Sequence, residues 1–303
     1  MNRHATLAPP PQPRFLMCPP RHFAVTYSIN PWMDPKEWAQ GASALQATAT
    51  RQWSDLNRVL REQGATIEMV DAVADLPDLV FTANAAVVLD RKALVARFRH
   101  PERQREEPVY TAAFHALKAR GLIDGVVTMP EGVALEGAGD CIYDASRRLF
   151  WMGCGFRSDA AAAKVVEAEF GVPSIPLTLA EASYYHLDTA LCVLPSGAVI
   201  YYPGAFTHEA LEALHARIPP EQRIALDPED ARRFAANAVC VGRTVVLSSC
   251  SEALRRALSA HGYAVVETLL DAFLRSGGSA CCLTLRLDRV SHAAQTAEVA
   301  VAR

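Results

Sequence analysis

The stretch TALCVLPSGAVIYYP, residues 189–203, contains the pattern that decides the fold. Two short apolar runs flank Pro195-Ser196-Gly197, which are residue types that favour a tight turn, so the stretch predicts a β-hairpin. The segment after it, HEALEALHARI (208–218), has the apolar spacing of a helix. A hairpin followed by a helix is therefore the local unit from which the rest of the chain can be interpreted.

The same order recurs on both sides of this stretch. CIYDASRRLFWMG (141–153) predicts a hairpin, and DAAAAKVVEAEFG (159–171) predicts a helix that ends at glycine. NAVCVGRTVVLSS (237–249) and CSEALRRALSAHG (250–262) repeat the pair. The remaining predicted elements are strands at 14–18, 65–70, 263–270 and 281–288, a hairpin formed by 79–90 and 92–98, and helices at 36–63 and 109–121.

A unit of hairpin, helix and strand thus repeats roughly every 50–60 residues, a period typical of arrays, propellers or closed rings. An ordinary α/β sheet is the commoner alternative. The recurring hairpins argue against it, because parallel sheets need helical crossovers between most strands. We expect one catalytic domain over 14–288, a disordered proline-rich tail at 1–13 and a C-terminal tail at 289–303.

Composition excludes several classes of protein. Half of the 303 residues are hydrophobic and the formal net charge is −3, which argues against a nucleic-acid-binding protein. No apolar run is long enough for a membrane span, and the N-terminus lacks the apolar core of a signal peptide. Eight cysteines without a C-x-x-C pattern favour a reduced, cytoplasmic protein without a structural zinc site.

The stretch GGSACCLTL (277–285) contains the first candidate for chemistry. Adjacent Cys281 and Cys282 can be buried thiols of a strand, since free cysteine is often a small core residue. In an alternating strand they face opposite sides, and the preceding glycines allow a close backbone approach. One thiol is therefore a candidate nucleophile if a base lies within reach.

Two further stretches carry acids and a histidine. In YYHLDTAL (184–191), His186 and Asp188 lie on one side of a predicted strand, an arrangement that suits acid–base work beside a cation. A strand-edge histidine with an ordinary hydrogen-bond partner is the alternative. In ALEGAGDCIY (134–143), Glu136 and Asp140 flank a glycine-rich bend, where they are either turn residues or a carboxylate pair for a guanidinium.

Asparagine, arginine and mixed-charge segments give weaker signals. Asn84 interrupts a predicted apolar strand and either pairs with backbone or points into a pocket. Asn30, before a proline, is either a turn residue or part of an apolar wall or lid with Trp32. Arg157 is either a helix-entry residue or a carboxylate clamp. The charged segment ARFRHPERQREEP (96–108) predicts a solvated loop.

Taken in order, LEGAGD (135–140), YYHLDTALCVLP (184–195) and the C-terminal GG-x-x-C resemble the guanidino-group-modifying enzymes, the pentein superfamily. That family includes arginine deiminases, amidinotransferases and dimethylarginine dimethylaminohydrolases. The resemblance covers about 15–287 and implies a five-fold α/β-propeller of ββαβ units around a polar channel. A translation initiation factor shares this fold without the catalytic residues, so a non-catalytic ring protein is the alternative from another class.

The resemblance implies roles for particular residues. Cys281 matches the nucleophile and His186 the general acid/base, while Glu136 and Asp188 match the acids that hold the guanidinium. Cys282 then faces away from the site. Arg157 falls where family members place an arginine on the substrate carboxylate.

The motifs MCPPRHFAVTYSINPWM (17–33) and FTANAA (81–86) look most like the arginine dihydrolase branch, which has an asparagine in each motif, here Asn30 and Asn84. That branch converts arginine to ornithine, carbon dioxide and ammonia. Dimethylargininase is the main alternative, followed by deiminase and amidinotransferase. The resemblance implies arginine or a methylated arginine as the substrate, no metal or organic cofactor, no nucleic-acid or membrane partner, and a homo-oligomer in some members.

Overall fold

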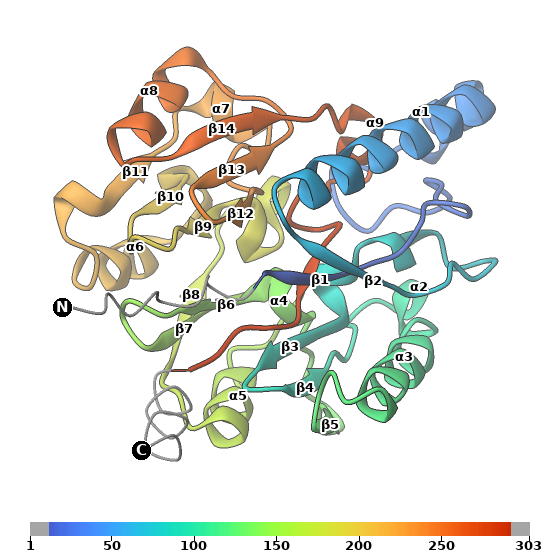
Figure 1. Cartoon of the computed structure of the whole chain (residues 1–303), viewed down its shortest axis with the longest axis horizontal. Helices are drawn as coiled ribbons and strands as arrows, with labels where there is room; N and C mark the ends of the chain where they lie inside the picture. The colour runs from blue at the N-terminus through green and yellow to red at the C-terminus, as the bar shows by residue number, and fades with distance from the viewer. Residues whose placement is uncertain (1–11, 292–303) are drawn as a thin grey trace, which may run out of the picture.

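The computed structural model describes residues 12–291 (Figure 1), and the predicted tails at 1–13 and 289–303 lie mostly outside this range. Its strands form five three-stranded sheets. The sheets are β3–β4–β5 (Ala86–Leu89, Lys92–Val95, Gly125–Thr128), β6–β7–β8 (Cys141–Asp144, Leu149–Cys154, Ser174–Thr178), β9–β10–β11 (Leu191–Val193, Val199–Tyr201, Arg223–Ala225), β12–β13–β14 (Val239–Val241, Thr244–Leu247, Ala264–Glu267) and β15–β1–β2 (Leu285–Arg286, Arg14–Met17, Thr66–Met69).

Every sheet combines one antiparallel pair with one parallel pair. In four of them the antiparallel pair is a hairpin, and in the fifth it joins β15 to β1; in all five the third strand runs parallel to the second after a helical crossover. The crossover helices are α1 (Pro35–Glu62), α3 (Glu107–Ala119), α5 (Ala162–Phe170), α6 (His208–His215) and α8 (Glu252–Ala260). The predicted repeat of hairpin, helix and strand is therefore confirmed.

The fifth sheet joins the two ends of the described chain. β15 pairs antiparallel with β1, so that Phe15 lies opposite Arg286, and β1 pairs parallel with β2. Figure 1 shows the crossover helices at the periphery of the molecule, with the strands nearer its middle and the short helix α4 (Gly137–Asp140) near the centre. This arrangement leaves the segments before the first strand of each unit close to the centre.

Local sequence explains where the helices begin and end. Thr207 caps α6 by accepting a hydrogen bond from the backbone N–H of Ala210, and Ser251 caps α8 in the same way. Gly171 ends α5 in the left-handed conformation, with φ +64°, which glycine adopts without a steric penalty. No helix within residues 12–291 is both long enough and apolar enough to span a membrane.

Three predictions of strand structure were wrong, and all three fall in the segments near the centre. Residues 79–85 were expected in a strand but form the 3-10 helices Pro77–Val80 and Thr82–Ala85, so Asn84 lies in a turn. Asp188 lies in the 3-10 helix Leu187–Thr189, and His186 immediately precedes it. Cys281 and Cys282 lie in a helical turn before β15, in which the N–H of Thr284 donates to the carbonyl of Cys281.

Candidate active site

Polar side chains meet where four segments end, each directly before the first strand of a sheet. The segments are Thr82–Ala85 before β3, α4 before β6, Leu187–Thr189 before β9, and residues 279–284 before β15. They contact one another because the repeated unit places equivalent segments at the same end of each sheet. The sequence places a potentially reactive group in each of them: Asn84, Glu136, His186 with Asp188, and the cysteine pair.

Glu136 is the most enclosed of these groups, with none of its surface exposed. Its Oε2 accepts a hydrogen bond from Nη1 of Arg157 at 2.9 Å and lies 2.8 Å from Nε2 of His186. Burial opposes ionisation, but Arg157 and His186 together hold the pKa of Glu136 well below its usual range. Glu136 is therefore a buried carboxylate at neutral pH.

His186 is neutral at neutral pH. Burial lowers its pKa from 6.5 to about 4, although the hydrogen bond to Glu136 favours the charged form. The ring is 1% exposed. A neutral imidazole beside a carboxylate can take up a proton during a reaction and release it again.

Asp140 accepts hydrogen bonds from groups next to Glu136 and His186 and so helps to position both residues. Its Oδ2 accepts from the hydroxyl of Ser158 at 2.6 Å, and its Oδ1 accepts from the backbone N–H of Leu187 at 2.9 Å. The hydroxyl of Ser158 in turn accepts from the backbone N–H of Glu136. The geometry thus makes Asp140 a residue that positions the segments of Glu136 and His186, because its oxygens are already occupied by these groups.

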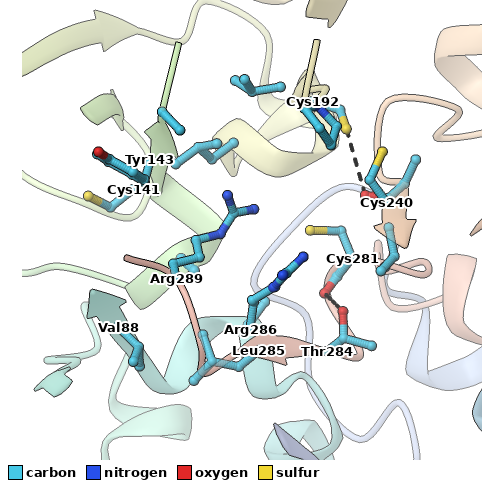
Figure 2. A pocket seen from close by; sticks show the side chains of 18 of the residues that line it. Val88, Cys141, Tyr143, Cys192, Cys240, Cys281, Thr284, Leu285, Arg286 and Arg289 are labelled. Carbon is cyan, nitrogen blue, oxygen red and sulfur yellow. Dashed lines mark hydrogen bonds between the residues drawn. The ribbon is translucent and has the colours of Figure 1, made fainter. Parts of the chain in front are cut away.

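The structure places the two cysteines the other way round from the prediction. Cys282, which was expected to face away, lines the small cavity with His186, whereas Cys281 lines a second, larger cavity on the other side (Figure 2). The prediction took Cys281 as the residue at the site from its spacing after the two glycines; the two thiols do lie on opposite sides, but in this turn it is Cys282 that lies beside His186. The thiol of Cys282 lies 3.3 Å from Oδ2 of Asp188 and 3.0 Å from Nδ2 of Asn237.

One oxygen of Asp188 makes no hydrogen bond within residues 12–291. Its Oδ2 contacts the thiol of Cys282, whereas its Oδ1 is buried without such a contact. Burial raises the pKa of Asp188 to about 7. Burial, and then the nearby Asp188, also raise the pKa of Cys282 well above 9.0. Both groups therefore lack a counter-charge that a bound guanidinium would supply.

Asn84 is held in one orientation by a buried arginine. Its Oδ1 accepts from Nη1 of Arg103 at 2.8 Å, and since arginine can only donate, this contact fixes which end of the amide is oxygen. Arg103 is itself held by two hydrogen bonds to Glu106, at 2.7 and 2.9 Å. The NH₂ group of Asn84 remains on the other side, 3.4 Å from the carbonyl of Glu136. Asn84 therefore presents a donor, not an acceptor.

The glycines of LEGAGD are required by the close approach of these segments. Gly137 has φ +60°, and a Cβ there would lie 2.7 Å from the backbone of Ala83 and Asn84. A Cβ at Gly139 would overlap the Asn84 amide. At the C-terminal end, a Cβ at Gly278 would overlap the ring of Phe81. Only glycine lets these turns come together around the site.

The shared space between these groups is very small. A cavity of about 10 Å³, enough for one water molecule at most, is enclosed by eleven residues. A molecule of amino-acid size does not fit this space. The lining residues are Asn30, Asp78, Phe81, Asn84, Arg103, Arg157, Tyr185, His186, Ser276, Gly278 and Cys282.

Asn30 and Arg157 line this cavity, and both are engaged by the protein. Asn30 donates to the carbonyl of Ser276 at 3.1 Å. Arg157, besides its bond to Glu136, donates to the carbonyl of Ile29 and stacks on the ring of Tyr185 at 4.4 Å. These contacts tie the N-terminal loop to the walls of the site.

Arg103 is the residue that sequence reasoning missed. It lies in the segment expected to be a solvated loop, but it is 2% exposed and its partner Glu106 is 1% exposed, so that prediction was wrong at these positions. The i,i+3 spacing of the two opposite charges in RQRE was the available signal. Among the described residues, no cluster of three or more histidine, cysteine or acidic side chains could hold a metal ion.

Comparison with protein families gives a match over residues 20–289 to the model described as N,N dimethylarginine dimethylhydrolase, eukaryotic. A bifunctional arginine dihydrolase/ornithine cyclodeaminase, AgrE from Nostoc sp., is 40% identical over 274 residues, which are 90% of this chain and 38% of that protein. The chain therefore spans well under half the length of that relative. A dimethylarginine dimethylaminohydrolase from Mycobacterium tuberculosis is 36% identical over 90% of this chain and 85% of its own length.

Solved structures show the same likeness. The N-terminal domain of the cyanobacterial arginine dihydrolase ArgZ, bound to its substrate, superposes with a TM-score of 0.86 and 37% identity. The match covers 92% of this chain and 99% of that domain. A variant of the same domain has been solved with a covalently bound reaction intermediate.

Proposed function

This chain belongs to the N,N-dimethylarginine dimethylhydrolase family, and from that premise we propose that it is an arginine dihydrolase that attacks the guanidinium carbon through Cys282. The observation that carries the proposal is that the thiol of Cys282 and the imidazole of His186 line one small cavity, and that each contacts a buried carboxylate, Asp188 and Glu136 respectively. This combination provides a nucleophile, a proton carrier and a binding site for a planar cation.

The cation itself completes the site. Asp188 with its free Oδ1 and Glu136 provide acceptors for guanidinium N–H groups. A bound positive charge next to Asp188 and Cys282 lowers both of their raised pKa values. The thiolate therefore forms in the presence of substrate, and the empty enzyme keeps a protonated, less reactive thiol.

The first round of the reaction breaks one C–N bond. The thiol proton of Cys282 passes to His186, and the sulfur forms a bond to the central guanidinium carbon. His186 then gives this proton to the departing nitrogen, which leaves as ammonia from a thiouronium adduct. A water molecule, deprotonated by neutral His186, attacks the same carbon and displaces the sulfur, which leaves citrulline in the site.

Asn84 supports a second round on this intermediate. A ureido group carries an oxygen that needs a hydrogen-bond donor, and the Asn84 amide presents its NH₂ because Arg103 occupies its oxygen. A carboxylate at this position could not donate. Repetition of attack and hydrolysis gives, overall, arginine plus two waters yielding ornithine, carbon dioxide and two molecules of ammonia. The scheme uses only side chains of this chain.

We further propose that the five sheets close into the α/β-propeller of the family, with Cys282 near its central channel, and that the protein acts in the cytoplasm. Five units of the same topology, with the two ends of the chain sharing one sheet, support closure. All eight cysteines are free thiols, which fits a reducing compartment.

Product analysis tests the proposed function. The protein is incubated with arginine and, separately, with asymmetric dimethylarginine, and the products are identified by mass spectrometry without an added amine acceptor. Ornithine from arginine is the expected result. Citrulline that accumulates without ornithine contradicts the second round, and a Cys282→Ser variant with full activity contradicts the nucleophile.

Dimethylargininase is the second candidate function. The 36% identity to the mycobacterial enzyme, over most of both chains, favours it. Cys282, His186 and Glu136 would serve in the same way, with dimethylamine as the leaving group. Citrulline and dimethylamine from the methylated substrate, at a rate above that with arginine, would assign this activity in place of the dihydrolase.

A further inference from the structure

A second cavity lies behind the cysteine turn, on the side away from His186. Its volume is about 400 Å³, within the range of roughly 300–1,000 Å³ of small-molecule sites. Figure 2 shows Cys192, Cys240 and Cys281 on one side of it and Arg289 opposite. We call this space the Arg289 cavity. It is a different cavity from the one beside His186, because Cys281 lines the one and Cys282 lines the other, although the Cys281 side chain also interacts with Asp188.

Arg289 provides a positive charge that has no partner among the described residues. Figure 2 shows its guanidinium extending into the middle of the cavity. Within residues 12–291 no side chain or carbonyl makes a hydrogen bond or ion pair with this guanidinium, whereas its backbone carbonyl accepts from Asp90. Burial, and then the like charge of Arg286, lower the pKa of the Arg289 side chain. This cation is therefore placed where water screens its charge only weakly.

The other charges around the cavity cancel one another. Arg286 donates to both oxygens of Asp288, at 2.8 and 3.1 Å. These two and Arg289 are the charged residues among those that line the space, so one positive charge remains. A ligand that offers a single negative charge would neutralise it, and a carboxylate matches the fork of guanidinium N–H groups.

The rest of the wall is mostly apolar. Val88, Leu191, Val239 and Leu285 line it together with four cysteine thiols, which behave as small hydrophobic groups. A strongly hydrated inorganic anion would leave this surface without a partner. An organic acid with an apolar body would cover it.

We propose that the Arg289 cavity is a second ligand site, which binds a small organic monocarboxylate by its carboxylate to Arg289 and by its apolar body to the surrounding wall. This site does not depend on the proposed reaction. It adjoins the proposed catalytic segment directly, since Cys281 lies against the ligand while the N–H of Cys282 donates to the side chain of Asn237.

Calorimetric titration with hexanoate tests the site on the full-length protein. We expect saturable binding at one site per chain, weakened roughly ten- to hundredfold in Arg289→Met, the usual loss for a charge-assisted pair. Arg256→Met, which removes an exposed arginine on α8, serves as the matched control and should bind as the wild type does. The neutral isostere hexanamide and inorganic phosphate are titrated in parallel and should bind more weakly.

A labelling experiment locates the ligand. Hexanoate should slow the alkylation of Cys281 by iodoacetamide, measured on peptides by mass spectrometry, and leave Cys250 unaffected as the internal control, because Cys250 lies beside Glu267 outside the cavity. Hexanoate should also leave the KM for arginine unchanged.

Four results would overturn the proposal. They are the absence of saturable binding up to about 10 mM, equal affinity in Arg289→Met, binding of hexanamide or phosphate as tight as that of hexanoate, and binding without protection of Cys281. Each can occur whether or not arginine is converted to ornithine, so failure of this site and failure of the proposed function remain distinguishable.

Discussion

Replacing Gly137 by alanine should damage the site through the backbone of its neighbour. Gly137 has φ +60°, a conformation that costs a residue with a Cβ about 1–2 kcal/mol. The new Cβ would also lie 2.7 Å from the backbone of Asn84, where an ordinary contact is about 3.5 Å. The segment of Asn84 must therefore move by roughly 0.8 Å, and such overpacking costs about 1–3 kcal/mol more.

Gly171→Ala is the matched control. Gly171 has φ +64°, so alanine meets the same backbone penalty, but a Cβ there would have nothing within 4 Å. Urea unfolding should show a loss of about 1–2 kcal/mol for Gly171→Ala and about 2–5 kcal/mol for Gly137→Ala. The difference between the two variants isolates the overlap with Asn84.

Activity provides the second measurement. Displacement of a reacting or binding group by about 1 Å can cost on the order of a hundredfold in rate. The rate of ornithine formation should therefore fall by more than tenfold in Gly137→Ala and stay near the wild-type rate in Gly171→Ala. Equal losses of stability in the two variants, or an unchanged rate in Gly137→Ala, would refute the argument that close approach to Asn84 requires glycine.

Three further variants test individual groups of the site. In a steady-state assay, Cys282→Ser should reduce the turnover of arginine by at least about a thousandfold, whereas Cys281→Ser should leave it within a few fold of the wild-type value. A large loss in Cys281→Ser and a small one in Cys282→Ser would instead identify Cys281 as the nucleophile. Burial raises the pKa of Asp188 from 3.8 to about 7, so ionisation of this group lowers the free energy of unfolding. This loss of stability is absent below about pH 4 and complete above about pH 7. Urea unfolding should accordingly show Asp188→Asn gaining stability over the wild type as pH rises from 4.5 to 8, by a few kcal/mol, and a pH-independent difference would contradict this sign. Arg103→Met should cost about 3–5 kcal/mol because it leaves the Glu106 carboxylate buried without its partner, and the double variant with Glu106→Leu should recover much of that loss when unfolding is followed by circular dichroism.

The repeat of hairpin, helix and strand could be predicted from the sequence because the residue patterns that specify it are local. TALCVLPSGAVIYYP contains both the apolar alternation of two strands and the turn residues between them, and the resulting strands β9 and β10 flank the predicted turn. Helix ends followed from single residues such as Gly171. Patterns of this kind depend on neighbours only a few positions away, so no tertiary information is needed to interpret them.

The candidate site could be predicted from the sequence only in part. The motifs around Glu136 and His186 identify residues that the structure brings within 2.8 Å of each other, although they are fifty positions apart. The choice between Cys281 and Cys282 was not accessible, because it depends on whether residues 279–284 are a strand or a turn. Tertiary contacts decide this, among them the hydrogen bond from the N–H of Cys282 to Asn237.

Arg103 could not be assigned for a different reason. A segment with seven charges in thirteen residues is normally solvated, and the burial of one of its ion pairs follows only from the packing of the segment against residues 78–84. The sequence shows which charges are present, whereas the fold decides which of them lose their contact with water.

The pairing of β15 with β1 also bears on how the protein is made. Phe15 and Arg286 must meet across almost the whole length of the chain, a contact of very high sequence separation that ordinarily forms late in folding. Four of the five sheets are complete once residue 267 has been synthesised, whereas Cys282 and strand β15 follow later in the chain. A growing chain would therefore carry four finished sheets before it has a reactive thiol for the proposed catalytic site, and that site can assemble only after residue 286 has been added.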